Sequence, residues 1–219
     1  MWEAAKEVAE CERVVEKGGG NLVSDLLRGS EAFYEWTHYP DGDVYDAETH
    51  SQYYYHAHEN EPGEHGHFHA FLRRGGMPAG IEPMPYRGRS ERPLGDDAIC
   101  HIAGISMDFQ GRPRGLFAAN RWVTGETWYP AAAVIRMLDA FRIDHAYPSW
   151  PVNRWVGALL RLFRPEVEAL LRQRDAVIAA WAERYPGRDV LEDPLLGLTG
   201  SLPISVVARI AELRTLVAA

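Results

Sequence analysis

Hydrophobic positions recur with a helical period at both ends of the chain. Residues 2–17 predict an amphipathic helix that ends at Gly18, and Asn21 is expected to cap a short helix over 21–28. The same period predicts four further helices, over residues 126–143, 152–163, 165–184 and 205–217. Residues 30–50 and 185–203 are rich in turn-forming residues, so we predict loops there.

The middle of the chain has the shorter period of strands. Residues 51–58 and 66–73 predict the two strands of a hairpin. Residues 99–109 and 115–123 are apolar on both faces, which predicts a second hairpin at the centre of the sheet. The order of elements predicts an α+β fold, in which an antiparallel sheet of about four or more strands, built from two hairpins, packs with N- and C-terminal helices.

The length of 219 residues predicts a single domain over residues 1–219. Within it we expect a helical N-terminus (1–29), an antiparallel sheet with a metal site (50–124) and a helical layer (125–219). The hydrophobic content of 46% is enough for a sizeable core.

Charge and cysteine usage narrow the expected partners and compartment. The net charge of −8 argues against nucleic acid, and the lack of an 18-residue apolar run argues against a membrane-spanning helix. Cys11 and Cys100 belong to no spaced motif, and the N-terminus has no secretion-signal pattern. We therefore expect reduced thiols and a cytoplasmic location, while the oligomeric state stays open.

The candidate chemistry lies in a cluster of histidines. Five of the nine histidines of the chain fall within fourteen residues, at alternating positions of the first predicted hairpin. Pro62-Gly63 is typical of a type II turn. If the chain folds back there, His56 faces His69 and His58 faces His67 on one side of the hairpin. A register shifted by two residues would keep the histidines on that same side. The predicted metal ligands are then His56, His58, His65, His67 and His69.

The alternative interpretation is a solvated surface cluster or a set of buried, hydrogen-bonded histidines. Five imidazoles at matched parity favour metal binding instead, because neighbouring side chains on a strand pair are close enough to share an ion. The opposite face suits a protein core, since its side chains are apolar or aromatic: Tyr53, Tyr55, Ala57, Phe68, Ala70 and Leu72.

Other residues are candidates for an additional ligand. Parity places Glu59 and Glu64 on the face away from the histidines, although a bulge can return one of them. His101, on the third predicted strand, either completes or borders the site. His38 and His50 precede the hairpin in a polar loop and are expected to be solvated.

Residues 38–44, 53–58, 64–71, 120–128 and 148–155, which include the His-x-His and His-Gly-His-Phe-His patterns, resemble those of an uncharacterised bacterial family, a domain of unknown function. The resemblance covers most of the chain and implies no activity. The His-x-His pattern is also similar to the first cupin motif, but the glutamate spacing differs and no histidine of a second motif follows. As a site, three histidines on neighbouring antiparallel strands resemble the zinc centre of α-class carbonic anhydrase.

Three functions remain open from the sequence. The favoured one is a metal-dependent enzyme with one transition-metal ion (iron, copper or zinc) and oxidoreductase or oxygenase-type chemistry on a small molecule. The alternatives are a metal carrier, buffer or sensor, and a structural zinc site. An open coordination position distinguishes the enzyme from the structural site, and exposed histidines would distinguish the carrier from the enzyme.

Overall fold

The strands form one antiparallel sheet in which each strand pairs with its neighbours in sequence. The computed structural model describes residues 1–58 and 62–218. Within them the sheet order is β1-β2-β3-β4-β5-β6. The strands are β1 (Tyr39–Tyr45), β2 (Ser51–His56), β3 (Gly66–Arg73), β4 (Ile99–Met107), β5 (Pro113–Ala119) and β6 (Leu198–Pro203).

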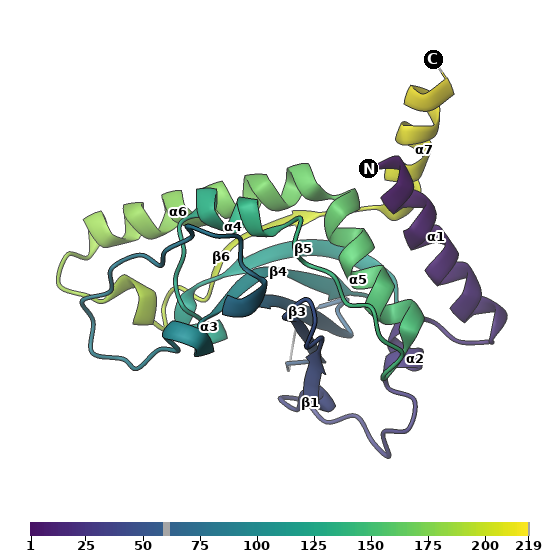
Figure 1. Ribbon diagram of the computed structural model, residues 1–219, viewed down its shortest axis with the longest axis horizontal. Helices are drawn as coiled ribbons and strands as arrows, with labels where there is room; N and C mark the ends of the chain where they lie inside the picture. Colours follow the sequence, from purple (N-terminus) through teal and green to yellow (C-terminus); the bar gives the residue numbers. More distant parts are fainter. Residues whose placement is uncertain (59–61, 219) are drawn as a thin grey trace.

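Helices lie over one face of this sheet (Figure 1). In chain order they are α1 (Trp2–Lys17), α2 (Leu22–Leu26), α3 (Arg121–Thr124), α4 (Ala131–Met137), α5 (Trp150–Leu162), α6 (Arg164–Arg184) and α7 (Val206–Ala218). Three short 3-10 helices, η1 (Arg74–Gly76), η2 (Gly95–Asp97) and η3 (Val190–Glu192), lie in the connections. Helices α1 and α7 lie side by side at one end of the molecule (Figure 1). The architecture is α+β with an antiparallel sheet, as the sequence predicts.

The helices predicted over residues 2–17, 152–163, 165–184 and 205–217 are confirmed to within two residues at each end, and local capping explains where two helices, α2 and α5, begin. The Asn21 side chain accepts a hydrogen bond from the Ser24 backbone N–H at 2.9 Å, which caps α2. The Ser149 hydroxyl accepts from the backbone N–H of Val152 at the start of α5, where Pro151 fills a first-turn position that tolerates proline.

Of the helix predicted over residues 126–143, only residues 131–137 are helical, so the prediction is wrong at both ends. Residues 121–124 form α3 instead, and Gly125 ends it with a positive φ of 63°. Residues 126–130 are not helical, and the backbone N–H of Thr127 donates to the Ile99 carbonyl at 2.8 Å. Because a helix cannot run through these two interruptions, α4 begins only after Pro130.

Two strands lie in segments that were predicted to be loops. β1 contains Pro40 and Gly42, and β6 contains Gly200 and Pro203. These residues are rare within central strands, but β1 and β6 are the two edges of the sheet, where proline and glycine are tolerated. Over residues 1–58 and 62–218 the sheet therefore has six strands, where two hairpins would give four.

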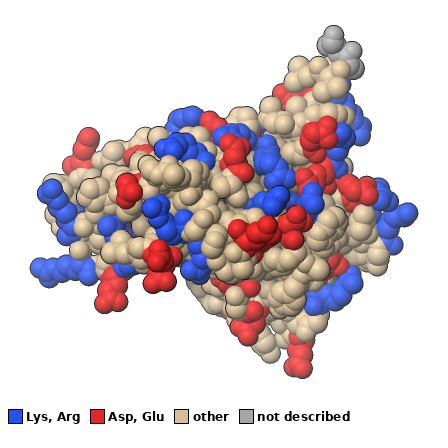
Figure 2. Space-filling model, viewed as in Figure 1, with Lys and Arg blue, Asp and Glu red and all other residues tan. Residues whose placement is uncertain are grey.

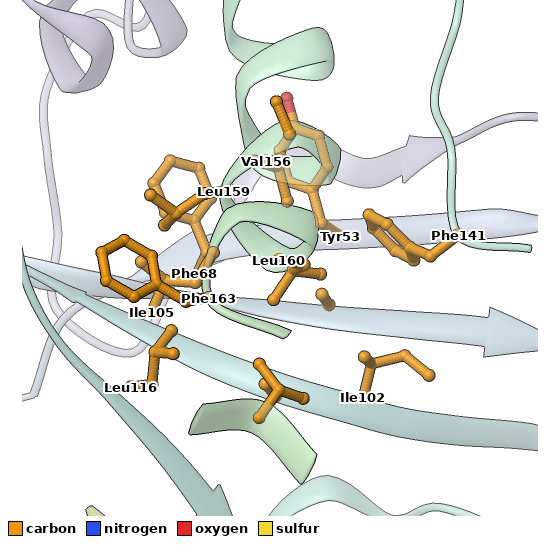
Figure 3. Packing of buried hydrophobic residues seen from close by; sticks show 14 of the residues in the cluster. Tyr53, Phe68, Ile102, Ile105, Leu116, Phe141, Val156, Leu159, Leu160 and Phe163 are labelled. Atoms are coloured by element: carbon orange, nitrogen blue, oxygen red, sulfur yellow. The ribbon is translucent and has the colours of Figure 1, made fainter. Parts of the chain in front are cut away.

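The helix-facing side of the sheet carries the main core. Tyr53, Tyr55 and Phe68 are fully buried, and the Tyr53 hydroxyl donates to the Asn153 side chain of α5 at 2.6 Å. The side chains of α5 meet those of the sheet in one packed layer (Figure 3). Each large apolar side chain buried there stabilises the fold by about 1.5–3 kcal/mol. The prediction that this face of the hairpin forms the core is confirmed.

Charged residues of both signs are interspersed on the face seen in Figure 2, with no large area of a single sign. Among the described residues, no helix has the length and apolar character needed to cross a bilayer. Both cysteines, Cys11 and Cys100, are buried free thiols.

Candidate metal centre

Strands β2 and β3 place three histidines on the sheet face opposite the helices. In the register of the two strands His56 pairs with His67, and Tyr54 pairs with His69. This register differs by two residues from the predicted pairing of His56 with His69. The reason is that β2 ends at His56 and β3 begins at Gly66, so the connection is longer than a tight turn around Pro62-Gly63. A shift of two conserves the face, so the imidazoles still lie together.

His56, His67 and His69 form a group that can hold a metal ion. Each offers one ring nitrogen, and the three nitrogens lie within 4.8 Å of one another. The Nε2 atoms of His56 and His67 are 2.7 Å apart. Two imidazole nitrogens bound to one ion at about 2.0–2.1 Å lie roughly 3 Å apart, so a small adjustment suffices for them to share it. All three side chains are buried, His69 most completely, at 1% exposure.

The carboxylate of Glu64 contacts His67 at the ring nitrogen that does not face His56. Oε1 of Glu64 lies 2.5 Å from Nδ1 of His67, and Oε2 of Glu64 accepts a hydrogen bond from the Ser106 hydroxyl. Burial opposes ionisation of Glu64, but its hydrogen bonds with His67 and Ser106 outweigh burial and hold the pKa of this carboxyl below its usual value. The carboxylate therefore accepts the Nδ1 proton of His67 and leaves the Nε2 lone pair free for a metal.

His101 of β4 lies behind His69. Its Nε2 atom is 3.0 Å from Nδ1 of His69, so the two rings share a hydrogen bond and the other nitrogen of His69 is left for the group. His101 thus orients a member of the triad rather than joining it. Of the adjacent pair Cys100 and His101, only the histidine faces the site, because neighbouring residues of a strand point to opposite faces.

Aromatic rings surround the triad. Tyr54 lies 5.2 Å from the His56 ring and 5.1 Å from the His69 ring, measured between ring centres. Phe117 of β5 lies 5.2 Å from His67 and 5.4 Å from His69, and its ring covers Gly104, where a side chain would collide with it. Phe71 lies further along the same face, 6.2 Å from His69. These walls lower the local dielectric and limit the access of water.

Burial keeps His56, His69 and His101 neutral. It lowers the pKa of His56 to about 3, and the neighbouring His67, His58 and His38 lower it further. Burial also lowers the pKa of His69 far below its ordinary value and that of His101 to about 3. Only a neutral imidazole has a lone pair for a metal, so at neutral pH these rings are in the form that binds one.

His58 lies at the rim of the triad. Its ring centre is 4.6 Å from that of His56 and 4.9 Å from that of His67, but its nitrogens do not join the group of three. The indole of Trp36, which is 67% exposed, stacks on His58 at 4.3 Å. This pair forms the exposed border of a buried site.

His65 and the predicted carboxylates depart from the predicted arrangement. Nδ1 of His65 lies 2.7 Å from the Tyr55 hydroxyl, and its ring stacks on Phe33 at 5.0 Å, so it belongs to the helix-facing side. Glu64, predicted on that side, instead contacts His67. Both residues precede β3, where the alternation of a strand does not apply. Glu59 lies outside the described residues.

Sequence reasoning missed three contributions to the site. Ser106 of β4 and Phe117 of β5 share the histidine face, as shown by the pairing of His67 with Ser106 and of Gly104 with Phe117. His38 is exposed, as expected, but its ring also stacks on Tyr54 at 3.6 Å and lies 5.5 Å from that of His56. The only signal for Phe117 in the sequence is a glycine in a central strand, which marks a close approach of another group.

A comparison with curated proteins and with solved structures finds no match to this chain. A family model matches residues 2–204, nearly the whole chain. The description of this family names no activity, so function must be inferred from the site. The chain belongs to the family described as domain of unknown function DUF6969.

Proposed function

We propose that the protein is a metal-dependent enzyme with a mononuclear site formed by His56, His67 and His69, acting on a small molecule. The observation that carries the proposal is the convergence of three buried imidazoles, one of them in contact with a carboxylate. Hydrogen bonds pair His56 with His67 and His69 with His101, but these two pairs do not by themselves require the three rings to converge. A shared ion accounts for this convergence and for the carboxylate behind His67 as well.

The number of grouped nitrogens favours an enzyme over a structural zinc site. Structural zinc has four protein ligands, whereas catalytic sites commonly have three and keep a position for substrate. Only three ring nitrogens converge among the described residues. The burial of the triad also argues against a carrier or buffer, because such proteins exchange their metal with solvent.

The surroundings favour oxidoreductase or oxygenase-type chemistry over hydrolysis. Iron or copper held there would supply electron transfer and oxygen chemistry, and zinc would supply a Lewis acid alone. The protein's own contribution is to orient the ligands and exclude water. Tyr54, Phe71 and Phe117 provide apolar walls, which protect a reactive site from competing hydrolysis. Glu64 holds the proton of His67 on Nδ1.

The test is elemental analysis of protein purified without a histidine tag. We expect about one transition-metal ion per chain, and His67→Ala should lose most of it. His65→Ala is the matched control: it removes an imidazole from the same hairpin, but one that faces the other side. Equal metal content in wild type and His67→Ala would refute the site. Rapid loss of the ion from wild type to a weak chelator would favour a carrier instead.

A further inference from the structure

We propose that a groove at the other end of the histidine face binds the carboxylate of the substrate. The groove has a volume of about 600 Å³, and its lining includes Tyr45, His50, Gln52, Arg73, Asp96 and Asp97. A carboxylate-binding groove would define the substrate class of the proposed enzyme. The groove itself does not require a metal, whereas the orientation of the substrate towards the triad rests on the proposed function.

The groove and the triad share one surface of the hairpin. Gln52 lies two residues before Tyr54, and Arg73 lies four residues after His69, so parity puts them on the face of the histidines. A strand rises about 3.3 Å per residue, which places Arg73 about 13 Å from His69 along β3. A small elongated molecule can span this interval with one end at each site.

Arg73 is held with its terminal nitrogens free. Its Nε donates to Oε1 of Gln52 at 2.6 Å, and its guanidinium lies 5.6 Å from the Tyr45 ring centre. Among the described residues, the two terminal nitrogens of Arg73 make no hydrogen bond or ion pair. A guanidinium fixed through Nε presents a pre-oriented pair of donors, which matches the two oxygens of a carboxylate.

Hydrogen bonds connect this guanidinium to the edge of the metal centre. Nε2 of Gln52 donates to Oδ2 of Asp43 at 2.6 Å, and Oδ1 of Asp43 lies 3.0 Å from Nδ1 of His38. The His38 ring in turn stacks on Tyr54, beside the triad. The groove is thus built into the same network of side chains as the site and is more than a surface depression near an arginine.

The charges of the lining define the class of ligand. Arg73 and Arg74 bring two positive charges, and Asp96 and Asp97 bring two negative charges. This balance leaves no excess positive charge for a polyphosphate, whose several negative charges the two aspartates would repel. A monocarboxylate fits the free donors of Arg73, and an amino acid adds a positive charge that the aspartates accept. The inferred substrate is therefore a small carboxylic acid or amino acid.

The first experiment tests the groove without any metal. Binding of hexanoate to metal-free protein is measured by calorimetry, with inorganic phosphate as the comparison anion. Arg73→Gln should weaken hexanoate binding roughly tenfold or more, because it removes charge-assisted hydrogen bonds. Arg74→Gln removes the same charge from the same lining, but this guanidinium already donates to the Ile81 carbonyl, so a change below about threefold is expected.

Three results would overturn the groove assignment: no hexanoate binding to wild type, an equal loss in Arg73→Gln and Arg74→Gln, or tighter binding of phosphate than of hexanoate. Arg73→Lys keeps the charge but loses the paired donors, and should recover only part of the affinity.

The second experiment tests the orientation of the ligand. In protein loaded with cobalt(II), NMR relaxation of bound hexanoate should be enhanced most at its methyl end, which would point from Arg73 towards the triad. Enhancement that is uniform, or strongest beside the carboxylate, overturns this orientation. If the protein holds no metal, the proposed function and the orientation fail together, and the Arg73 comparison still decides whether the groove binds carboxylates.

Discussion

Replacing Glu64 by glutamine tests whether the carboxylate behind His67 is part of a metal centre. In the wild type this carboxylate accepts the Nδ1 proton of His67 at 2.5 Å, and the Ser106 hydroxyl donates to its other oxygen. Glutamine has nearly the same shape and keeps one acceptor oxygen. The change therefore removes a charge and one acceptor while leaving the backbone and the size of the side chain unaltered.

The expected magnitude follows from what each amide orientation does to His67. If the amide oxygen faces Nδ1, a charge-assisted hydrogen bond worth about 1.5–3 kcal/mol becomes a neutral one worth about 0.5–1.5 kcal/mol. If the amide nitrogen faces Nδ1, His67 must carry its proton on Nε2, which cannot then bind a metal. Loss of such an outer carboxylate typically costs about 10–100-fold in metal affinity, and we expect Glu64→Gln to fall in that range.

The assay is a competition titration of zinc or cobalt(II) between protein and a coloured chelator at neutral pH. Ser106→Ala is the matched control, since it removes the other hydrogen bond of Glu64 but keeps the charge; it should cost less than Glu64→Gln. Urea denaturation of both metal-free variants reports whether either change disturbs the fold.

Metal affinity of Glu64→Gln within about twofold of wild type would refute the role of this carboxylate in ligand orientation. A larger loss of metal affinity in Ser106→Ala than in Glu64→Gln would also refute this role. It would mean that packing near β4, and not the tautomer of His67, sets the metal affinity.

Two further predictions concern the walls of the site and a buried acid beside it. Gly104→Ala should lower the free energy of unfolding by about 1–3 kcal/mol and weaken metal binding, because the new methyl group displaces the Phe117 ring. Urea denaturation measures the loss of stability. Gly187→Ala is the control, because a methyl group at Gly187 meets no neighbouring atom. Burial raises the pKa of Glu126 to about 7, so the folded state holds a proton that the unfolded state loses above pH 4.5. As the pH rises from 4.5 to 7, this group should therefore lower the free energy of unfolding by up to about 1.4 kcal/mol per pH unit. Glu126→Gln should lack this contribution. Identical profiles of stability against pH in the wild type and Glu126→Gln would contradict the raised pKa of Glu126.

The histidine face could be predicted because strand parity depends only on local backbone geometry. His56, His67 and His69 keep their common face although the register differs by two residues from the expected one. The same rule fails at Glu64 and His65, which lie before the first residue of β3. Where the backbone leaves the extended conformation, alternation carries no information about the direction of a side chain. Glu64 therefore lies on the histidine face and His65 on the helix-facing side, the reverse of the predicted arrangement.

Contributions from distant strands could not be predicted. Phe117 reaches the triad only because β5 pairs with β4, and His38 reaches it only because β1 pairs with β2. β1 has the composition of a turn, and its pairing as an edge strand depends on a partner that the local sequence does not specify. The sequence thus predicted which histidines share a face better than it predicted the residues around them.

The two faces of β2 and β3 explain how the imidazoles converge without depending on a metal for folding. Tyr53, Tyr55 and Phe68 are locked into the core on one face, so a slip of one residue would move them out of it and bring the histidines in. The free-energy cost of exposing these core side chains therefore fixes the register of β2 and β3, independently of the histidines on the opposite face. The triad is therefore held together by the core, in contrast to small zinc domains that fold only when the metal binds. Because the core already holds the triad together, an ion bound there would not be needed to stabilise the fold.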